Sequence, residues 1–422
     1  MLISKLKNKL SGQYIRNVGW MGGAEFANRI FRLGTTVILA RALTAYDYGL
    51  VAVVLTTNEI ANVFTLRAGI GSKIIQAKKE DVNLLCDTAY WMNWILCIVL
   101  FIIQCGVAFP IAWFYKDNHI ILPIIAISLT YLILPVYAIQ GALIFRENRL
   151  HVGALCNVLQ SLSGNILTVI FALSGMGVWA VVLPIILTNP IWLIVNLRSH
   201  KWRPTQPFTL YRWKEIAVFA TNVLGVEVLN KLRANLDYLI IGRFLGIEVL
   251  GIYYFAFNAG IGISLNVINS LMWSLYPHLC EVRENFHELK KRYFNSLKTV
   301  AYIIIPLVLL QSSLAPFYVP IIFGQKWINA IPILVLVCLS AIPRPFAEAA
   351  GHLLKAVDKP SIDLYFNLIF TVIFTIGLLI SVNWGIFSIA AFVLIAHVLV
   401  MPIFTIYSNR LVFTNYNFNS KY

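Results

Sequence analysis

Twelve apolar stretches of about 20 residues alternate with polar connections along the chain. A bilayer core about 30 Å thick needs about 20 helical residues for each crossing. The predicted membrane spans are residues 19–40, 48–70, 89–114, 120–144, 153–174, 177–197, 216–241, 249–276, 298–320, 328–352, 362–382 and 385–407. The pattern therefore predicts an all-α polytopic membrane protein with twelve transmembrane helices.

Composition and charge agree with this fold class and add an orientation. The chain is 59% hydrophobic and 12% charged, whereas soluble domains carry about 25% charged residues. With a cytoplasmic N-terminus, 24 of the 33 Lys and Arg residues fall in cytoplasmic segments and four on the opposite side. Because basic residues favour the cytoplasmic side, both termini are expected there. The net charge of +15 then lies mainly beside anionic lipids, and nucleic-acid binding is not needed to explain it.

An internal repeat divides the chain into two halves. Seven of 27 positions from Gly23 to Gly49 recur 202 residues later, between Gly225 and Gly251. With a shift of 210, Pro135 falls on Pro345. Because each half has an even number of spans, both halves begin on the same side of the membrane and form two pseudo-symmetric six-helix lobes. The expected parts are an interfacial N-terminal segment (1–18), an N-lobe (19–197), a cytoplasmic linker (198–215), a C-lobe (216–407) and a cytoplasmic tail (408–422).

Ionisable side chains inside the predicted spans are the candidate functional residues. Such a group costs about 2.5–3.5 kcal/mol on insertion scales, so it normally faces a protein interior or a watery cavity. The basic residues are predicted to form a cationic substrate site and are Arg29, Arg32, Lys231, Arg233 and Arg344. The supporting acids are Glu25, Glu59, Glu227, Asp237 and Glu348. Arg favours bidentate contact with phosphate, so we expect an anionic headgroup as substrate.

Helical spacing predicts partners for most of these acids. Residues at i and i+4 lie on one face of a helix, which pairs Glu25 with Arg29, Glu227 with Lys231, Arg233 with Asp237 and Arg344 with Glu348. The alternative is that these pairs only hold the two halves together. Arg344 lies between Pro343 and Pro345, where we expect a local break in the tenth helix.

Glu59 has no base one turn away and lies among Thr56, Thr57, Asn58 and Asn62. If transport is driven by an ion, this carboxylate is the predicted coupling residue for H⁺ or Na⁺. The alternative is that it crosses to another helix and pairs with Arg29 or Arg32.

No enzyme signature occurs in the sequence. A P-loop, a His-Glu-x-x-His motif, a nucleophile elbow and a Cys-x-x-Cys motif are all missing, and the six cysteines show no paired spacing. We therefore expect no catalytic residues, no metal site and no cofactor.

Two segments resemble a known family. Gly22-Gly-Ala-Glu-Phe-Ala-Asn-Arg, followed by Leu39-Ala-Arg-Ala-Leu-Thr-Ala-Tyr-Asp-Tyr-Gly-Leu, is similar to the opening of Wzx-type polysaccharide transporters, and Phe145-Arg-Glu-Asn-Arg supports the similarity. These transporters belong to the multidrug/oligosaccharidyl-lipid/polysaccharide flippase superfamily. The resemblance implies a flippase of a bacterial cytoplasmic membrane that moves undecaprenyl-pyrophosphate-linked oligosaccharides for O-antigen, capsule or exopolysaccharide synthesis. Membrane lipids, and a glycan polymerase or chain-length machinery, are the further partners that it suggests.

Two other classes stay open. A multidrug extruder of the same superfamily should favour cationic drugs and an acidic cavity, which the surplus of Arg and Lys disfavours. A membrane enzyme of glycan assembly needs carboxylates and a sizeable loop domain at the membrane face, and the outer loops are short.

Overall fold

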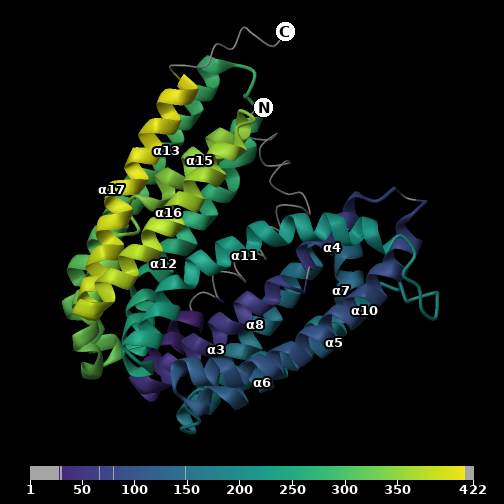
Figure 1. Ribbon diagram of the computed structural model, residues 1–422, viewed down its shortest axis with the longest axis horizontal. Coiled ribbons are helices and arrows are strands. Elements are labelled where there is room, and N and C mark those ends of the chain that lie inside the picture. Colours follow the sequence, from purple (N-terminus) through teal and green to yellow (C-terminus); the bar gives the residue numbers. More distant parts are fainter. Residues whose placement is uncertain (1–27, 29–30, 66, 79, 148, 414–422) are drawn as a thin grey trace, which may run out of the picture. The chain divides into compact units, whose positions relative to one another are not determined.

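The computed structural model describes residues 28, 31–65, 67–78, 80–147 and 149–413, and these residues form helices and connections without a strand (Figure 1). Residues 31–42 are helical. The next helices are α3 (Ala45–Val63), α4 (Arg67–Gln76), α5 (Val82–Tyr115), η1 (Asn118–Ile120), α6 (Ile121–Ser128), α7 (Thr130–Arg146), α8 (Leu150–Leu173), α9 (Trp179–Thr188) and α10 (Pro190–Ser199). They are followed by α11 (Trp213–Phe244), α12 (Ile247–Cys280), α13 (Phe286–Tyr318), η2 (Val319–Phe323), η3 (Gln325–Ala330), α14 (Ile331–Leu339), α15 (Arg344–Ala356), α16 (Pro360–Ser381), η4 (Val382–Trp384) and α17 (Ile386–Phe413).

Eight helical segments of the described chain are long and apolar enough to cross a membrane. They coincide with eight of the predicted spans and confirm an all-α polytopic membrane protein. The predicted spans 48–70, 216–241 and 249–276 fall on α3 with α4, on α11 and on α12. Only the end of the first predicted span lies within the described residues, and the interfacial segment 1–18 lies outside them.

Two helices are interrupted at corresponding places in the two halves. The first interruption is at Leu129, between α6 and α7, and the second is at residues 340–343, between α14 and α15. Before each interruption a serine hydroxyl bonds back to the carbonyl three residues earlier, from Ser128 to Ile125 at 2.6 Å and from Ser340 to Val337 at 2.6 Å. Hydroxyls that bond back in this way bend helices. The break predicted beside Arg344 is confirmed.

The described residues form two compact units that divide within α11, between Asn235 and Leu236. In the first unit, α5 packs against α6 and α7, α8 packs against α9, and α7 packs against α10. A core of Ile70, Leu85, Ile139 and Ala220 joins α4, α5, α7 and α11. In the second unit α12, α13, α15, α16 and α17 run alongside one another (Figure 1).

The predicted linker, residues 198–215, folds onto the first unit. Thr205 donates its backbone N–H to Asp87 Oδ1 at 2.9 Å, and Thr88 donates its hydroxyl to the Tyr211 carbonyl at 2.7 Å. Arg212 Nη1 lies 2.9 Å from Asp81 Oδ1. These bonds place the linker and the start of α11 in the first unit, so the division lies further along the chain than the linker. The two-lobe organisation stays a prediction.

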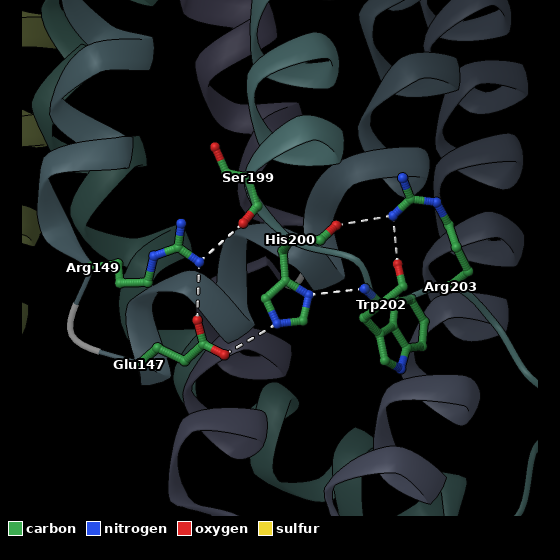
Figure 2. Close-up of polar contacts among 6 residues, drawn as sticks. All are labelled: Glu147, Arg149, Ser199, His200, Trp202 and Arg203. Carbon is green, nitrogen blue, oxygen red and sulfur yellow. Dashed lines mark hydrogen bonds and ion pairs between the residues drawn. The ribbon is translucent and has the colours of Figure 1, made fainter.

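The loop after α7 is clamped to the end of α10 by polar contacts that Figure 2 shows. Arg149 Nη1 donates to the carbonyl of Ser199 at 2.9 Å and to Glu147 Oε2 at 3.3 Å. The other carboxylate oxygen of Glu147 bonds to Nε2 of His200 at 3.3 Å. A cation at the last carbonyls of a helix satisfies acceptors that lack an intrahelical donor, so Arg149 caps α10.

The ring of His200 is held in one tautomer. Its Nδ1 accepts the backbone N–H of Trp202 at 3.1 Å, so the proton lies on Nε2, where it can be donated to Glu147. Arg203 adds bonds to the carbonyls of Leu197 and His200, both at 3.1 Å. The end of α10 is therefore fixed by two arginines, one on each side (Figure 2).

Candidate functional site

A cavity of about 670 Å³ lies inside the first unit. Its walls come from α3, α4, α5, α7, α8, α9, α10 and α11 together with connecting residues. Small-molecule sites usually measure about 300–1,000 Å³. The cavity is therefore large enough for a ligand, and the helices that line it include membrane-crossing candidates.

Neutral polar side chains give this cavity its character. Its amide residues are Asn58, Asn62, Asn93, Asn189 and Asn196. The sequence interpretation named Asn58 and Asn62 only as neighbours of Glu59, and it missed Asn93, Asn189 and Asn196. An asparagine in the middle of an apolar span is a readable signal, because a polar group in lipid needs a partner.

Hydrogen bonds order part of this lining. The Tyr131 hydroxyl lies 3.1 Å from Asn58 Oδ1 and 2.9 Å from Gln104 Oε1. Asn196 Nδ2 donates to the carbonyl of Trp192 at 2.8 Å. These bonds fix side chains from α3, α5, α7 and α10 around the same space.

Asn189 presents an acceptor that the protein does not use. Asn189 connects α9 to α10 and lines the cavity. Its Oδ1 is buried and has no hydrogen-bond partner. A buried polar atom without a partner is costly.

An aromatic pair forms another part of the wall. The rings of Tyr137 and Trp192 are stacked, with centroids 6.2 Å apart and planes inclined by 28°. Trp192 Nε1 donates to Gln160 Oε1 at 2.7 Å, which fixes the indole. Tyr137 is 3% exposed and backs the partly exposed indole of Trp192, which offers a rigid apolar surface beside the amides.

Glu227 is the one formally charged side chain among the described residues that line the cavity. No Lys or Arg is among them. The expected cationic lining is thus not found in this cavity, whose described walls are neutral apart from one carboxylate.

Glu59 and Lys231 form an ion pair beside the cavity. Lys231 Nζ lies 2.9 Å from Glu59 Oε2, and the side chains are 46% and 51% exposed. Asn58, the neighbour of Glu59, lines the cavity, and so does Glu227, one turn before Lys231. The pair therefore joins α3 to α11 next to residues that line the cavity.

The partner predicted for Lys231 was wrong. Among the described ion pairs, Lys231 contacts Glu59 and not Glu227, because its long side chain reaches the neighbouring helix α3. Glu59 crosses to another helix, as the alternative interpretation held, but its base is Lys231 rather than Arg29 or Arg32. Its role in ion coupling stays a prediction.

The remaining predicted bases of the first unit are less defined. Glu25 and Arg29 lie outside the described residues. Arg32 is exposed within the helix at residues 31–42. Arg233 Nη2 lies 3.4 Å from Asn230 Oδ1. Their contact with substrate stays a prediction.

A second polar cluster, in the second unit, surrounds Asp237. The Tyr253 hydroxyl donates to Asp237 Oδ2 at 2.8 Å, and the backbone N–H of Tyr238 donates to Oδ1 at 3.0 Å. Asp237 is 6% exposed and interacts electrostatically with Arg344. The predicted pairing with Arg233 is not among the interactions described for Asp237, because this carboxylate is directed to Tyr253 on α12.

Arg344 begins α15, directly after the break in the tenth predicted span. Its Nη2 lies 3.3 Å from Ser340 Oγ. Glu348 Oε1 lies 3.9 Å from His352 Nε2; the predicted Arg344–Glu348 pair is not among the described ion pairs, because Glu348 contacts the following turn of α15. Whether Arg344 binds substrate stays a prediction.

Comparison with known proteins shows which family and which relatives the chain resembles. Residues 38–332 match the model of the family described as "Polysaccharide biosynthesis protein". The lipopolysaccharide biosynthesis protein WzxC of Escherichia coli (strain K12) is 26% identical over 82% of this chain and 70% of its own length. The succinoglycan biosynthesis transport protein ExoT of Rhizobium meliloti (strain 1021) is 22% identical over 84% of this chain and 71% of its own length.

A solved structure has the same fold. The lipid II flippase MurJ, in its inward closed conformation, superposes with a TM-score of 0.77 at 12% identity, covering 93% of this chain and 87% of that chain. Because the family model covers well over half of the sequence, this chain belongs to the polysaccharide biosynthesis protein family.

Proposed function

We propose that the protein is a flippase that moves undecaprenyl-pyrophosphate-linked oligosaccharides across the bacterial cytoplasmic membrane. The observation that carries this proposal is a cavity of about 670 Å³, with five asparagines in a mainly apolar wall, inside a bundle of helices that include membrane-crossing candidates. The names of WzxC and ExoT, and the fold shared with the lipid II flippase MurJ, support it. The protein is a transporter and not an enzyme.

The proposed transport cycle follows from the free-energy cost of moving a polar headgroup through the hydrocarbon core of the bilayer. The sugars and pyrophosphate cannot cross hydrocarbon without a polar environment, whereas the polyprenyl tail is apolar and stays in lipid. Polar lining therefore needs to shelter only the head of the substrate. We propose that the protein alternates between states open to either side, as transporters with internal repeats do.

The finer topology belongs to the same proposal. Twelve spans in two six-helix lobes, with both termini cytoplasmic, place the basic loops beside anionic lipid. Arg29, Arg32, Lys231, Arg233 and Arg344 are the candidates for holding the pyrophosphate, since all are basic residues in predicted spans. Coupling to H⁺ or Na⁺, and contact with a glycan polymerase or chain-length machinery, are further parts of the proposal.

A multidrug extruder is the second candidate, because the one charged side chain described in the cavity wall is the carboxylate of Glu227. A cationic drug would be attracted to it. The family assignment favours glycan transport.

The two candidates differ in the effect of deleting the gene in its native host. A flippase deletion accumulates the lipid-linked repeat unit inside the cell and abolishes the surface polysaccharide, and the native gene restores both. An unchanged surface polysaccharide and an unchanged pool of the lipid intermediate would contradict the proposal. Increased drug sensitivity without a glycan defect would favour the extruder.

A further inference from the structure

We infer that the cavity of the first unit is a subsite for uncharged sugar rings of the substrate head, and that the pyrophosphate binds outside it. This inference rests on the proposed function and names what this particular cavity accepts. It departs from the expectation of one cationic cavity that receives the whole polar head.

The charge of the walls argues against a pyrophosphate ligand. Among the described lining residues there is no Lys or Arg, and the one formal charge is the carboxylate of Glu227. A multiply charged anion placed there would lose hydration without gaining a counter-charge, and Glu227 would repel it. A neutral ligand avoids both costs.

Hydrogen-bonding capacity of the walls suits sugar hydroxyls. Each hydroxyl both donates and accepts, and an amide side chain offers donors and an acceptor together. Five asparagines line this one cavity: Asn58, Asn62, Asn93, Asn189 and Asn196. The Oδ1 of Asn189 is buried and unpartnered, so a rotation of this amide toward the cavity would give the oxygen a sugar hydroxyl as donor.

The partly exposed indole of Trp192, backed by the buried ring of Tyr137, suits the apolar face of a sugar ring. Tyr137 and Trp192 are stacked at 6.2 Å, and Gln160 holds the indole N–H at 2.7 Å. A rigid ring surface with adjacent amides contacts both the C–H face and the hydroxyl rim of a sugar, and binding loses little side-chain entropy because the rings are already ordered.

Space and position complete the argument. At about 670 Å³ the cavity is within the usual range of roughly 300–1,000 Å³ for small-molecule pockets, which suits sugar rings but not a polyprenyl tail. Two described bases lie next to its wall and not within it: Lys231 pairs with Glu59, and Arg146 Nη1 donates to the carbonyls of the lining residues Ile74 and Ile75 at 2.6 and 2.9 Å. Binding of the sugars inside the cavity and of the pyrophosphate outside it therefore matches the distribution of charged side chains in and around the cavity wall.

Two matched comparisons test this subsite. In the first, Asn196→Leu removes a cavity amide whose Nδ2 bonds to the carbonyl four residues earlier at 2.8 Å. Asn258→Leu is its control, because Asn258 makes the same bond at 2.8 Å in α12 and does not line the cavity. Asn189→Leu removes the unpartnered oxygen.

The second comparison fills the cavity. A Cβ atom built at Gly71, in the cavity wall, meets no atom within 4 Å, so the side chain of Gly71→Phe begins in open space and adds bulk there. Gly106→Phe is the control, since Gly106 is exposed on α5, a Cβ atom built there also meets no atom within 4 Å, and Gly106 does not line the cavity.

The measurement is binding to the full-length protein in nanodiscs. One ligand is the lipid-linked repeat unit extracted from the native host, and the other is undecaprenyl pyrophosphate without sugar. We expect the cavity variants to weaken binding of the glycosylated lipid by about tenfold, or 1.4 kcal/mol, and to leave binding of the bare lipid unchanged. The control variants should match the native protein with both ligands.

The outcomes separate the subsite from the proposed function. Cavity variants that bind both lipids like the native protein, or lose both equally, would overturn the sugar subsite while leaving the flippase proposal intact. If the native protein binds neither lipid, the proposed function itself fails, and the subsite fails with it.

Discussion

The ion pair of Glu59 and Lys231 allows a direct test of whether an intramembrane charge serves the substrate or only the fold. The side chains are 46% and 51% exposed, and exposed pairs contribute about 0.2–1 kcal/mol to stability. Even 1 kcal/mol is only about a fivefold change in the ratio of folded to unfolded protein. Neutralising either residue should therefore leave the protein folded and abundant.

Three variants distinguish the two roles: Lys231→Ala, Glu59→Gln and the double variant. If Lys231 supplies positive charge to the pyrophosphate, transport falls in Lys231→Ala and stays low in the double variant. We expect a loss of about tenfold, or 1.4 kcal/mol in binding. Glu59→Gln releases the ammonium group from its partner and keeps transport.

The assay is translocation of the lipid-linked repeat unit in proteoliposomes, normalised to reconstituted protein and accompanied by thermal unfolding. A double-mutant cycle isolates the coupling of the two residues. The cationic-site reasoning is wrong if both single variants lose transport equally and the double variant regains it. Repeating the assay with an imposed proton or sodium gradient tests coupling, and gradient stimulation that persists in Glu59→Gln would remove Glu59 from that role.

Three further changes test other parts of the structure. Pro345→Ala restores a backbone N–H at the start of α15 and should let the helix extend across the break, altering transport more than protein abundance; equal losses of both would refute a role of the break in transport. Arg149→Ala removes the cap from the carbonyl of Ser199 and should lower the free energy of unfolding by about 1–2 kcal/mol, measured by denaturation, with unchanged stability contradicting the clamp. Tyr46→Phe removes the 2.5 Å bond from Tyr46 to Asp117, which lies in the connection after α5. Burial opposes ionisation of Asp117, but hydrogen bonds from Tyr46 and His119 outweigh it and lower the pKa of this carboxyl. At pH values above the ordinary pKa of an aspartate, the ionised carboxylate therefore stabilises the fold, and this stabilisation is lost as the pH falls through the lowered pKa. The native protein should be more stable than Tyr46→Phe at neutral pH, and the difference should shrink in acid. A difference that grows in acid would refute this reasoning.

The features that depend on local chemistry could be predicted from the sequence. Apolar length predicted the membrane-crossing helices, because each span must satisfy its own backbone in lipid. The two prolines around Arg344 predicted the break between α14 and α15. The corresponding break at Leu129 was not predicted. Ser128 and Thr130 bond to preceding carbonyls there, but a serine and a threonine in a sequence are a weaker signal of a helix break than two prolines.

The sequence was insufficient where the site depends on packing between helices. Spacing at i and i+4 assigned Glu227 to Lys231, yet the lysine contacts Glu59, which is 172 residues away. Asn58, Asn93 and Asn189 come from separate segments, and only the packing of those segments brings their amides to one cavity. A hydrophobic pattern shows that each asparagine is unusual but not that they converge.

Translocation by the purified native protein tests the central claim most directly. Proteoliposomes would carry the lipid-linked repeat unit of the native host, and an added enzyme that acts on the exposed glycan would report how much of it has reached the outer leaflet. The proposed function predicts that the protein raises the exposed fraction well above that of protein-free vesicles, and that Gly71→Phe reduces the increase while Gly106→Phe does not. Exposure equal to that of protein-free vesicles, from correctly folded native protein, would contradict the account.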